Sequence, residues 1–203
     1  MIDNFNKLTI GKYLELMEIL EDNTLADIDK NVEIIALLDD EEVDVIYDLP
    51  LSEFNEKMQK TAFLYETPKP LQVSTVYKLG EMELEACLNL EKLTTAQFID
   101  YQTYVKENDK LVELLSVFLI PKGKKYNREY DIVELQKVIR DNMPITQAMG
   151  LSDFFLLLYK SFLKASLTSS IKKLKKMMRK EKDLEKKKMM KQAIQGLQLN
   201  GLG

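Results

Sequence analysis

Lysine side chains near the end of the chain are the residues best suited to binding, because their charges accumulate over a short stretch. Residues 171–191 contain eleven Lys or Arg and three Asp or Glu, a charge of +8, which leaves −12 on the rest of a chain whose net charge is −4. A basic segment on an acidic protein predicts contact with an acidic partner: nucleic acid, another protein or a second copy of this chain. The predicted contact residues are Lys172, Lys173, Lys175, Lys176, Arg179, Lys180, Lys186, Lys187 and Lys188.

The composition of this segment favours some partners over others. It has one arginine and no aromatic residue, so it suits phosphate contact but not base stacking or insertion into a lipid surface. No Gly or Pro interrupts it before Gly196, which predicts a long basic helix. An alternative role is a solvated helix that packs an apolar stripe on protein, and the residues of this stripe are Leu167, Ile171, Leu174, Met178, Met190, Ile194 and Leu197.

Catalytic chemistry has little support in the composition. The chain has no histidine, which removes the usual general base and the commonest zinc ligand. Cys87 is the single cysteine, so no disulfide forms within the chain, and no neighbouring cation in the sequence would activate its thiol. We therefore predict that the protein is not an enzyme.

Two short motifs approach known binding sites without matching them. Gly123-Lys124 lacks both the earlier glycine of a phosphate loop, where Phe118 stands, and the Ser or Thr after the lysine. The acidic run Asp39–Asp44 lacks the glycine and the spacing of a calcium loop, and it suits the start of a helix instead. No cofactor and no metal ligand is predicted.

Helical periodicity dominates the first part of the chain. Thr9 is a candidate N-cap for a helix, and an apolar core helix is expected over Val32–Leu38. A third helix is expected after the acidic run, and Pro50 separates it from a fourth that Ser52 would cap and that continues to about Leu64. These elements form a predicted N-terminal helical module, residues 1–66.

A short β-hairpin is expected next, in a connector over residues 67–92. Apolar residues alternate on both sides of Gly80, and Glu81, Glu83 and Glu85 would line a water-facing side. Because an isolated hairpin is marginally stable, it should pack on a helix or pair with another chain, which makes it a candidate docking edge.

The pattern of the first module then returns, which predicts a second helical module at 93–166 and a basic arm at 167–203. Lys7-Leu8-Thr9 is echoed by Lys92-Leu93-Thr94, and Leu51-Ser52-Glu53-Phe54 by Leu151-Ser152-Asp153-Phe154. The echo suggests a divergent duplication with an insertion at Pro121–Asn127. Chance is the alternative, since both motifs are typical helix starts.

The expected fold class is therefore mainly α, with two related small helical modules separated by a short β-hairpin and a long basic C-terminal helix. The content of Leu, Lys and Glu and the scarcity of Gly and Pro support helix. The sequence contains no run of about 20 apolar residues, so no membrane span is predicted. The N-terminus also lacks the basic start and apolar block of a secretory signal.

The motif Leu8-Thr9-Ile10-Gly11-Lys12-Tyr13 and its second version, Leu93–Asp100, resemble proteins in the virion modules of tailed bacteriophages of Bacteroidetes, the crAss-like group included. The resemblance covers about Leu8–Leu158 and leaves the basic arm unmatched, and Ala96 stands where the first copy has Gly11. It implies a virion structural component, located in the virion and in the host cytoplasm during assembly. The implied partners are other phage structural proteins, further copies of this chain in a homo-oligomer, and packaged DNA through non-specific contact. Two alternatives are a transient head or tail assembly chaperone and a nucleic-acid-binding accessory protein.

Overall fold

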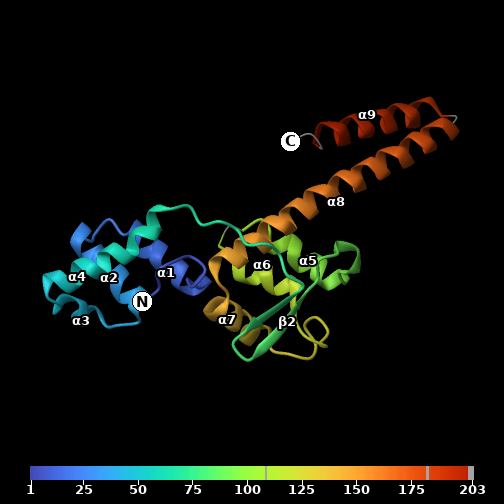
Figure 1. Ribbon diagram of the computed structural model, residues 1–203. Coiled ribbons are helices and arrows are strands. Elements are labelled where there is room, and N and C mark those ends of the chain that lie inside the picture. Colours follow the sequence, from blue (N-terminus) through green and yellow to red (C-terminus); the bar gives the residue numbers. More distant parts are fainter. Residues whose placement is uncertain (108, 182, 201–203) are drawn as a thin grey trace. The chain divides into compact units, whose positions relative to one another are not determined.

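The computed structural model describes the backbone of residues 1–107, 109–181 and 183–200, and it does not describe the side chains of 158–167, 169, 184 and 196–200. The chain divides into two compact units, Met1–Asp153 and Phe154–Gly203. Helices dominate it, and a small three-stranded antiparallel sheet is the other regular element (Figure 1). The expected mainly α-helical class with a short antiparallel element is confirmed at this level.

The first unit begins with a cluster of short helices. They are α1 (Ile10–Glu21), α2 (Asp27–Asp39), α3 (Val43–Tyr47), α4 (Leu51–Lys60) and the 3₁₀ helix η1 (Thr61–Tyr65). Thr9 caps α1 as predicted, since its side chain accepts a hydrogen bond from the Lys12 amide. The predicted core helix is α2, in which Val32 and Ile35 are buried against Ile46 of α3 and Phe54 of α4.

The acidic run was expected at the start of one helix; its second half begins α3 as expected, whereas its first half ends α2. Asp39 is the last residue of α2, Asp40 adopts a left-handed conformation after it, and Glu42 is the N-cap of α3. A carboxylate at the C-terminal end of a helix is unfavourable, because this end of the helix dipole is negative. Asp39 is stabilised there by ion pairs with the N-terminal amine and with Lys57 of α4. The predicted cap at Ser52 is also wrong, because Pro50 precedes α4 and Ser52 lies inside it.

The sheet consists of β1 (Val76–Leu79), β2 (Met82–Ala86) and β3 (Leu119–Pro121), in that order. Gly80 turns the β1–β2 hairpin with a φ of 57°, which glycine adopts without strain. Tyr77, Leu79 and Leu84 are buried on one face, whereas the glutamates of β2 are exposed as predicted. The pairing of β2 with β3 was not predicted, and it covers the β2 edge that would otherwise be open.

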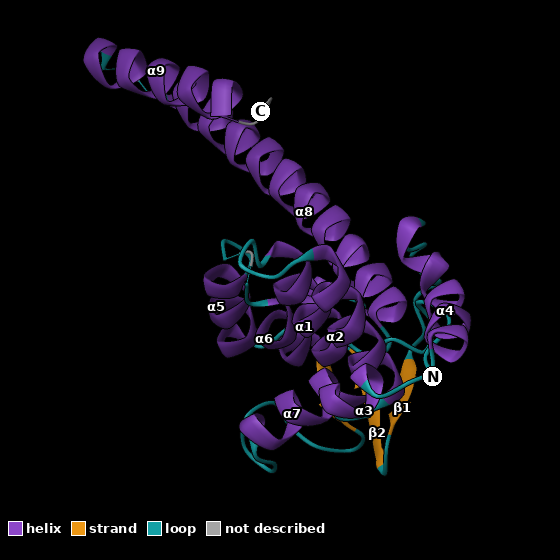
Figure 2. Cartoon of the chain, turned by 90° about the vertical axis from the view of Figure 1, so that its left-hand side faces the viewer, coloured by secondary structure: helices purple, strands orange, loops and turns teal. Residues whose placement is uncertain are grey.

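A second group of helices lies beside the sheet in the same unit, where α6 contacts β3 and α7 contacts β1 (Figure 2). It contains the 3₁₀ helix η2 (Leu90–Lys92), α5 (Thr95–Tyr104), α6 (Leu111–Phe118) and α7 (Ile132–Asn142). Thr94 and Gln97 form a capping box at the start of α5, and the buried Gln97 side chain also donates to the Val117 carbonyl of α6 at 2.8 Å. Each of the two echoed threonines therefore starts a helix.

Backbone pairing ties the beginning of the chain to the end of the first unit. The Ile10 amide donates to the Met143 carbonyl and the Ile145 amide donates to the Leu8 carbonyl. The second echo has no common structure, because Leu51 begins α4 whereas Leu151 lies within α8 (Ile145–Lys180).

Phe154–Gly203 contains most of α8 and all of α9 (Leu184–Asn200). The first of these helices ends at Lys180 and the second begins at Leu184, and in both views α9 runs back alongside α8 (Figures 1 and 2). Asp183 caps α9, since its carboxylate accepts the amides of Glu185 and Lys186. The basic segment is thus divided between two helices, which sequence periodicity did not predict.

Candidate functional site

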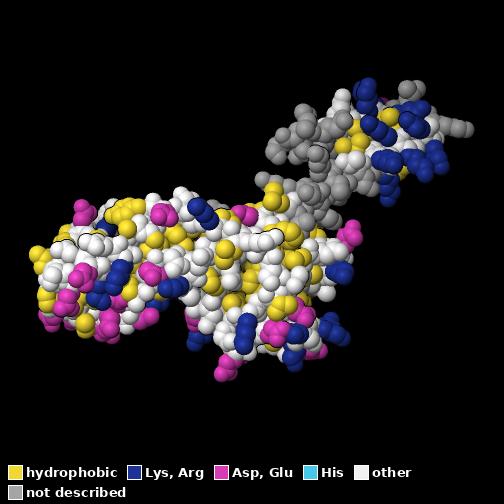
Figure 3. Space-filling model, in the orientation of Figure 1, with side chains coloured by type: hydrophobic (Ala, Val, Ile, Leu, Met, Phe, Trp, Pro, Cys, Tyr) yellow, Lys and Arg dark blue, Asp and Glu magenta, His cyan; other side chains and the backbone are white. Residues whose placement is uncertain are grey.

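The nine predicted contact residues lie on two helices of one unit. Six are on α8 and the remaining three are on α9. Every one of them is exposed except Lys187, which is half-buried. Figure 3 shows their side chains gathered along both helices. We call the segment from Ile171 of α8 to the end of α9 the basic hairpin. Lys182 lies outside the described residues.

Helical spacing explains why the cations face outward. Ile171, Leu174 and Met178 recur three and four residues apart on α8 and are half-buried. On α9, Met190 is half-buried and Ile194 is 6% exposed. These apolar side chains form the inner face of the hairpin, which leaves the opposite face of α8 to the lysines. The side chains of Leu167 and Leu197, predicted as part of the same stripe, lie outside the described residues.

The nine contact residues of the basic hairpin are unpaired in the part of the chain that the structure describes. None of its nine contact residues forms an ion pair with a residue that the structure describes, whereas the ion pairs of the first unit include Lys122–Glu83 and Lys7–Asp3. Residues 154–203 contain 13 Lys or Arg and three Asp or Glu, a charge of +10, which leaves −14 on residues 1–153. Lysine ammonium groups on flexible stems bind anions as point charges, without a fixed geometry. The arrangement suits a broad acidic surface better than a small anion.

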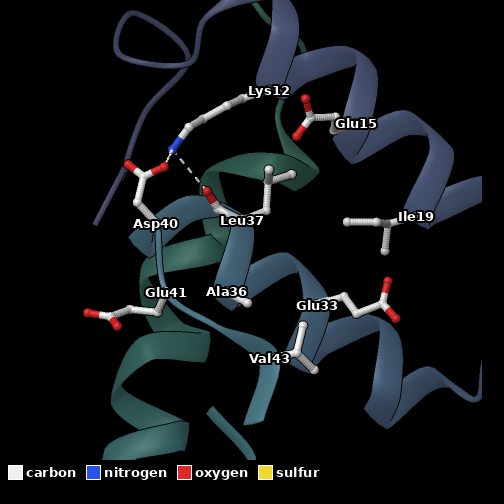
Figure 4. Close-up of a pocket in the computed structure, with 9 residues that line it drawn as sticks. All are labelled: Lys12, Glu15, Ile19, Glu33, Ala36, Leu37, Asp40, Glu41 and Val43. Carbon is white, nitrogen blue, oxygen red and sulfur yellow. Dashed lines mark hydrogen bonds and ion pairs between the residues drawn. The ribbon is translucent and has the colours of Figure 1, made fainter. Parts of the chain in front are cut away.

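A shallow pocket of about 320 Å³ lies between α1, α2 and the start of α3 (Figure 4). The one cation that lines it is already engaged in the fold: Lys12 pairs with Asp40 and donates to the Leu37 carbonyl at 3.0 Å. These contacts hold α1 against the end of α2. The pocket is therefore explained by the packing of the helices.

Other polar groups of the first unit also have structural roles. The Tyr126 hydroxyl donates to Asp100 at 2.7 Å, and burial together with this hydrogen bond raises the pKa of Tyr126 well above its usual range. Cys87 is half-buried, and its thiol lies 3.6 Å from the Asn89 carbonyl. Gly123, in the loop that partly resembles a phosphate loop, has a φ of 74°, and a Cβ atom at this position would meet no atom within 4 Å. Among the described residues, no group of three or more His, Cys, Asp or Glu is arranged to hold a metal ion.

None of the described helices combines the length and apolar character needed to cross a bilayer. No protein-family model matches the sequence, and neither the curated proteins nor the solved structures contain a significant match to the chain.

Proposed function

We propose that the protein is a non-enzymatic structural component of a tailed-phage particle that acts through protein contacts made by its basic hairpin. The observation that carries the binding role is the exposure of the cations on α8 and α9 without acidic partners among the described residues. The phage setting is supported by the resemblance of the Leu8–Tyr13 and Leu93–Asp100 motifs to virion-module proteins.

An acidic protein surface is the preferred partner class. Point-charge contacts of lysine suit carboxylates spread over a surface, and the first unit of a neighbouring copy offers such a surface with its charge of −14. The homo-oligomer expected from the sequence follows from this pairing, in which the basic hairpin is the latch between subunits. Packaged DNA is the competing polyanion, because it presents phosphates at high density.

Glutamine substitution of four adjacent lysines on α8 tests the binding role. Gln has nearly the helix propensity of Lys, so the variant Lys172→Gln, Lys173→Gln, Lys175→Gln, Lys176→Gln should keep its circular dichroism spectrum. We expect it to lose salt-sensitive self-association in sedimentation velocity. A matched control replaces Lys124 and Lys125, two exposed lysines of the first unit, with Gln. If the wild type self-associates and the four-Gln variant associates equally well, the basic hairpin is not the contact between copies.

A 30-base-pair duplex titrated at 50 and 200 mM NaCl separates DNA from protein as the partner. Contact with about five phosphates would weaken DNA binding roughly 500-fold between these salt concentrations, from a slope of about −0.9 per contact. If DNA binding shows this salt dependence and the protein does not self-associate, the partner of the basic hairpin is nucleic acid and not a second copy of the chain.

Mass spectrometry of purified particles tests the phage setting. A stoichiometric amount of this chain is expected for a structural component. Its presence in infected cells together with its absence from finished particles would instead identify a transient assembly chaperone.

A further inference from the structure

A groove on the first unit has the apolar and acidic lining that suits a basic amphipathic helix. It lies between α1, the start of α6 and α7, and encloses about 740 Å³. Its apolar lining comes from Leu14, Met17, Val112 and Val133, of which Leu14 is 39% and Val133 is 68% exposed. Apolar side chains left this open to water on neighbouring helices are typical of a docking surface.

Carboxylates outnumber cations around this groove. The acidic lining residues are Glu18, Glu21, Asp109, Glu113 and Asp141, and the basic ones are Lys137 and Arg140. Glu113 is paired with Lys110 at 3.2 Å, and Arg140 lies 3.8 Å from Glu15. Glu18, Glu21 and Asp141 are exposed. The groove therefore combines apolar side chains with an acidic rim, a combination that selects an amphipathic cation.

The basic hairpin carries the complementary pattern. Met177 on α8 is 47% exposed, and Lys173 and Lys180 lie four residues before it and three after it on the same side of the helix. An apolar side chain flanked by two cations matches an apolar groove flanked by carboxylates. Methionine is suited to such a contact, because its flexible side chain adapts to an irregular apolar surface.

We propose that the Met177 face of α8 in one copy docks in the α1–α6–α7 groove of a second copy. The inference rests on the proposed function, since it names the surface to which the basic hairpin binds. The helix presents Met177 to the apolar side chains of the groove, while Lys173 and Lys180 approach the carboxylates of the rim, as in recognition of an amphipathic helix by a groove. Repetition of one contact from copy to copy builds a ring or a larger assembly.

Charge exchange between two full-length variants tests the pairing. The groove variant is Glu18→Lys, Glu21→Lys, Asp141→Lys, and the hairpin variant is Lys173→Glu, Lys180→Glu; all five positions are exposed, so the fold should tolerate the changes. In sedimentation velocity at 50 mM NaCl, we expect wild type to associate and each variant alone to associate at least about tenfold more weakly. An equimolar mixture of the two variants should associate again, because the exchanged charges are complementary.

A control variant with Glu53→Lys and Glu56→Lys, two exposed acids of α4 away from the groove, should associate like wild type. Met177→Gln removes the apolar contact without a change of charge, and it should weaken association at 300 mM NaCl as well as at 50 mM. If the groove variant associates like wild type while the hairpin variant does not, the groove is refuted and the binding role of the hairpin stands. A wild-type protein that stays monomeric at 50 mM NaCl would overturn the inter-copy contact, and the DNA titration then decides whether the binding role of the hairpin also fails.

Discussion

Replacing Gly150 with alanine tests the close contact between the start of α8 and the connector that leads to the sheet. The Leu71 amide donates to the Thr146 carbonyl at 2.9 Å, which brings the connector backbone across α8. A Cβ atom at position 150 would lie 2.0 Å from the Leu71 carbonyl oxygen and 3.1 Å from its carbon. Ordinary contact begins at 3.4 Å, so the connector must move by about 1.4 Å.

The magnitude follows from three opposing contributions. Gly to Ala inside a helix ordinarily stabilises by about 0.5–1 kcal/mol. Against this, forced movement in a packed site costs about 1–3 kcal/mol, and the loss of the Leu71–Thr146 hydrogen bond costs about 1 kcal/mol. We therefore expect Gly150→Ala to lower the free energy of unfolding by about 2 kcal/mol, or the melting temperature by about 4–8 °C.

Urea and thermal unfolding monitored by circular dichroism give this difference directly. Gly123→Ala is the matched control, because its Cβ meets nothing within 4 Å and the φ of 74° alone should cost about 1 kcal/mol. A Gly150→Ala protein as stable as wild type, or more stable, would refute the reasoning, because the connector would then give way without loss.

Two further predictions concern the stability of the first unit. Asp39→Asn removes the carboxylate that pairs with Lys57 and the N-terminal amine, and urea unfolding at pH 7 should show a loss of about 1–3 kcal/mol. Burial raises the pKa of the Asp39 carboxyl, but hydrogen bonds from Lys57 and the N-terminal amine outweigh burial and leave this pKa lowered. The contribution of Asp39 to the free energy of unfolding is therefore fully present above the unfolded pKa and is lost as the pH falls through the folded pKa. The difference between wild type and Asp39→Asn should therefore shrink in strong acid, and a constant difference would contradict this. Thr94→Ala removes the capping box and should lower the free energy of unfolding by about 1 kcal/mol. Urea unfolding should show this as a lower midpoint with an unchanged m-value. Thr94→Ser keeps the hydroxyl and should stay close to wild type.

The sequence predicted correctly those elements that depend on residues close together in the chain, namely helix starts and the hairpin. Thr9 was predicted to cap a helix and does so, and Thr94 of the echoed motif caps one too, because the capping hydrogen bond spans only three residues. The hairpin around Gly80 was also predicted, since alternation and a glycine turn are adjacent in the sequence.

Features that depend on distant contacts were missed. Leu119–Pro121 looks like the end of an apolar helix, and it becomes a strand only because β2, more than 30 residues earlier, offers an unpaired edge. Asp39 reads as the start of a helix until the N-terminal amine and Lys57 are brought beside it. The groove between α1, α6 and α7 could not be predicted from the sequence, because its lining residues come from three separate segments. The start of α9 had a local signal, Asp183 as its N-cap, that the absence of Gly and Pro concealed.

The charge of the basic hairpin opposes the stability of its own helix, which is the strongest physical reason to assign it a binding role. Like charges three or four residues apart on a helix destabilise it, and residues 171–180 of α8 contain six such pairs, so the repulsion amounts to about 1–3 kcal/mol at low salt. These pairs are 172/175, 173/176, 176/179, 172/176, 175/179 and 176/180. The apolar inner face needs none of these charges, and glutamine would serve equally well on the outer face. A fold-only role thus predicts that the four-Gln variant gains helix stability and loses nothing else. A binding role predicts that stability rises while association falls, and the two measurements on one variant separate the roles.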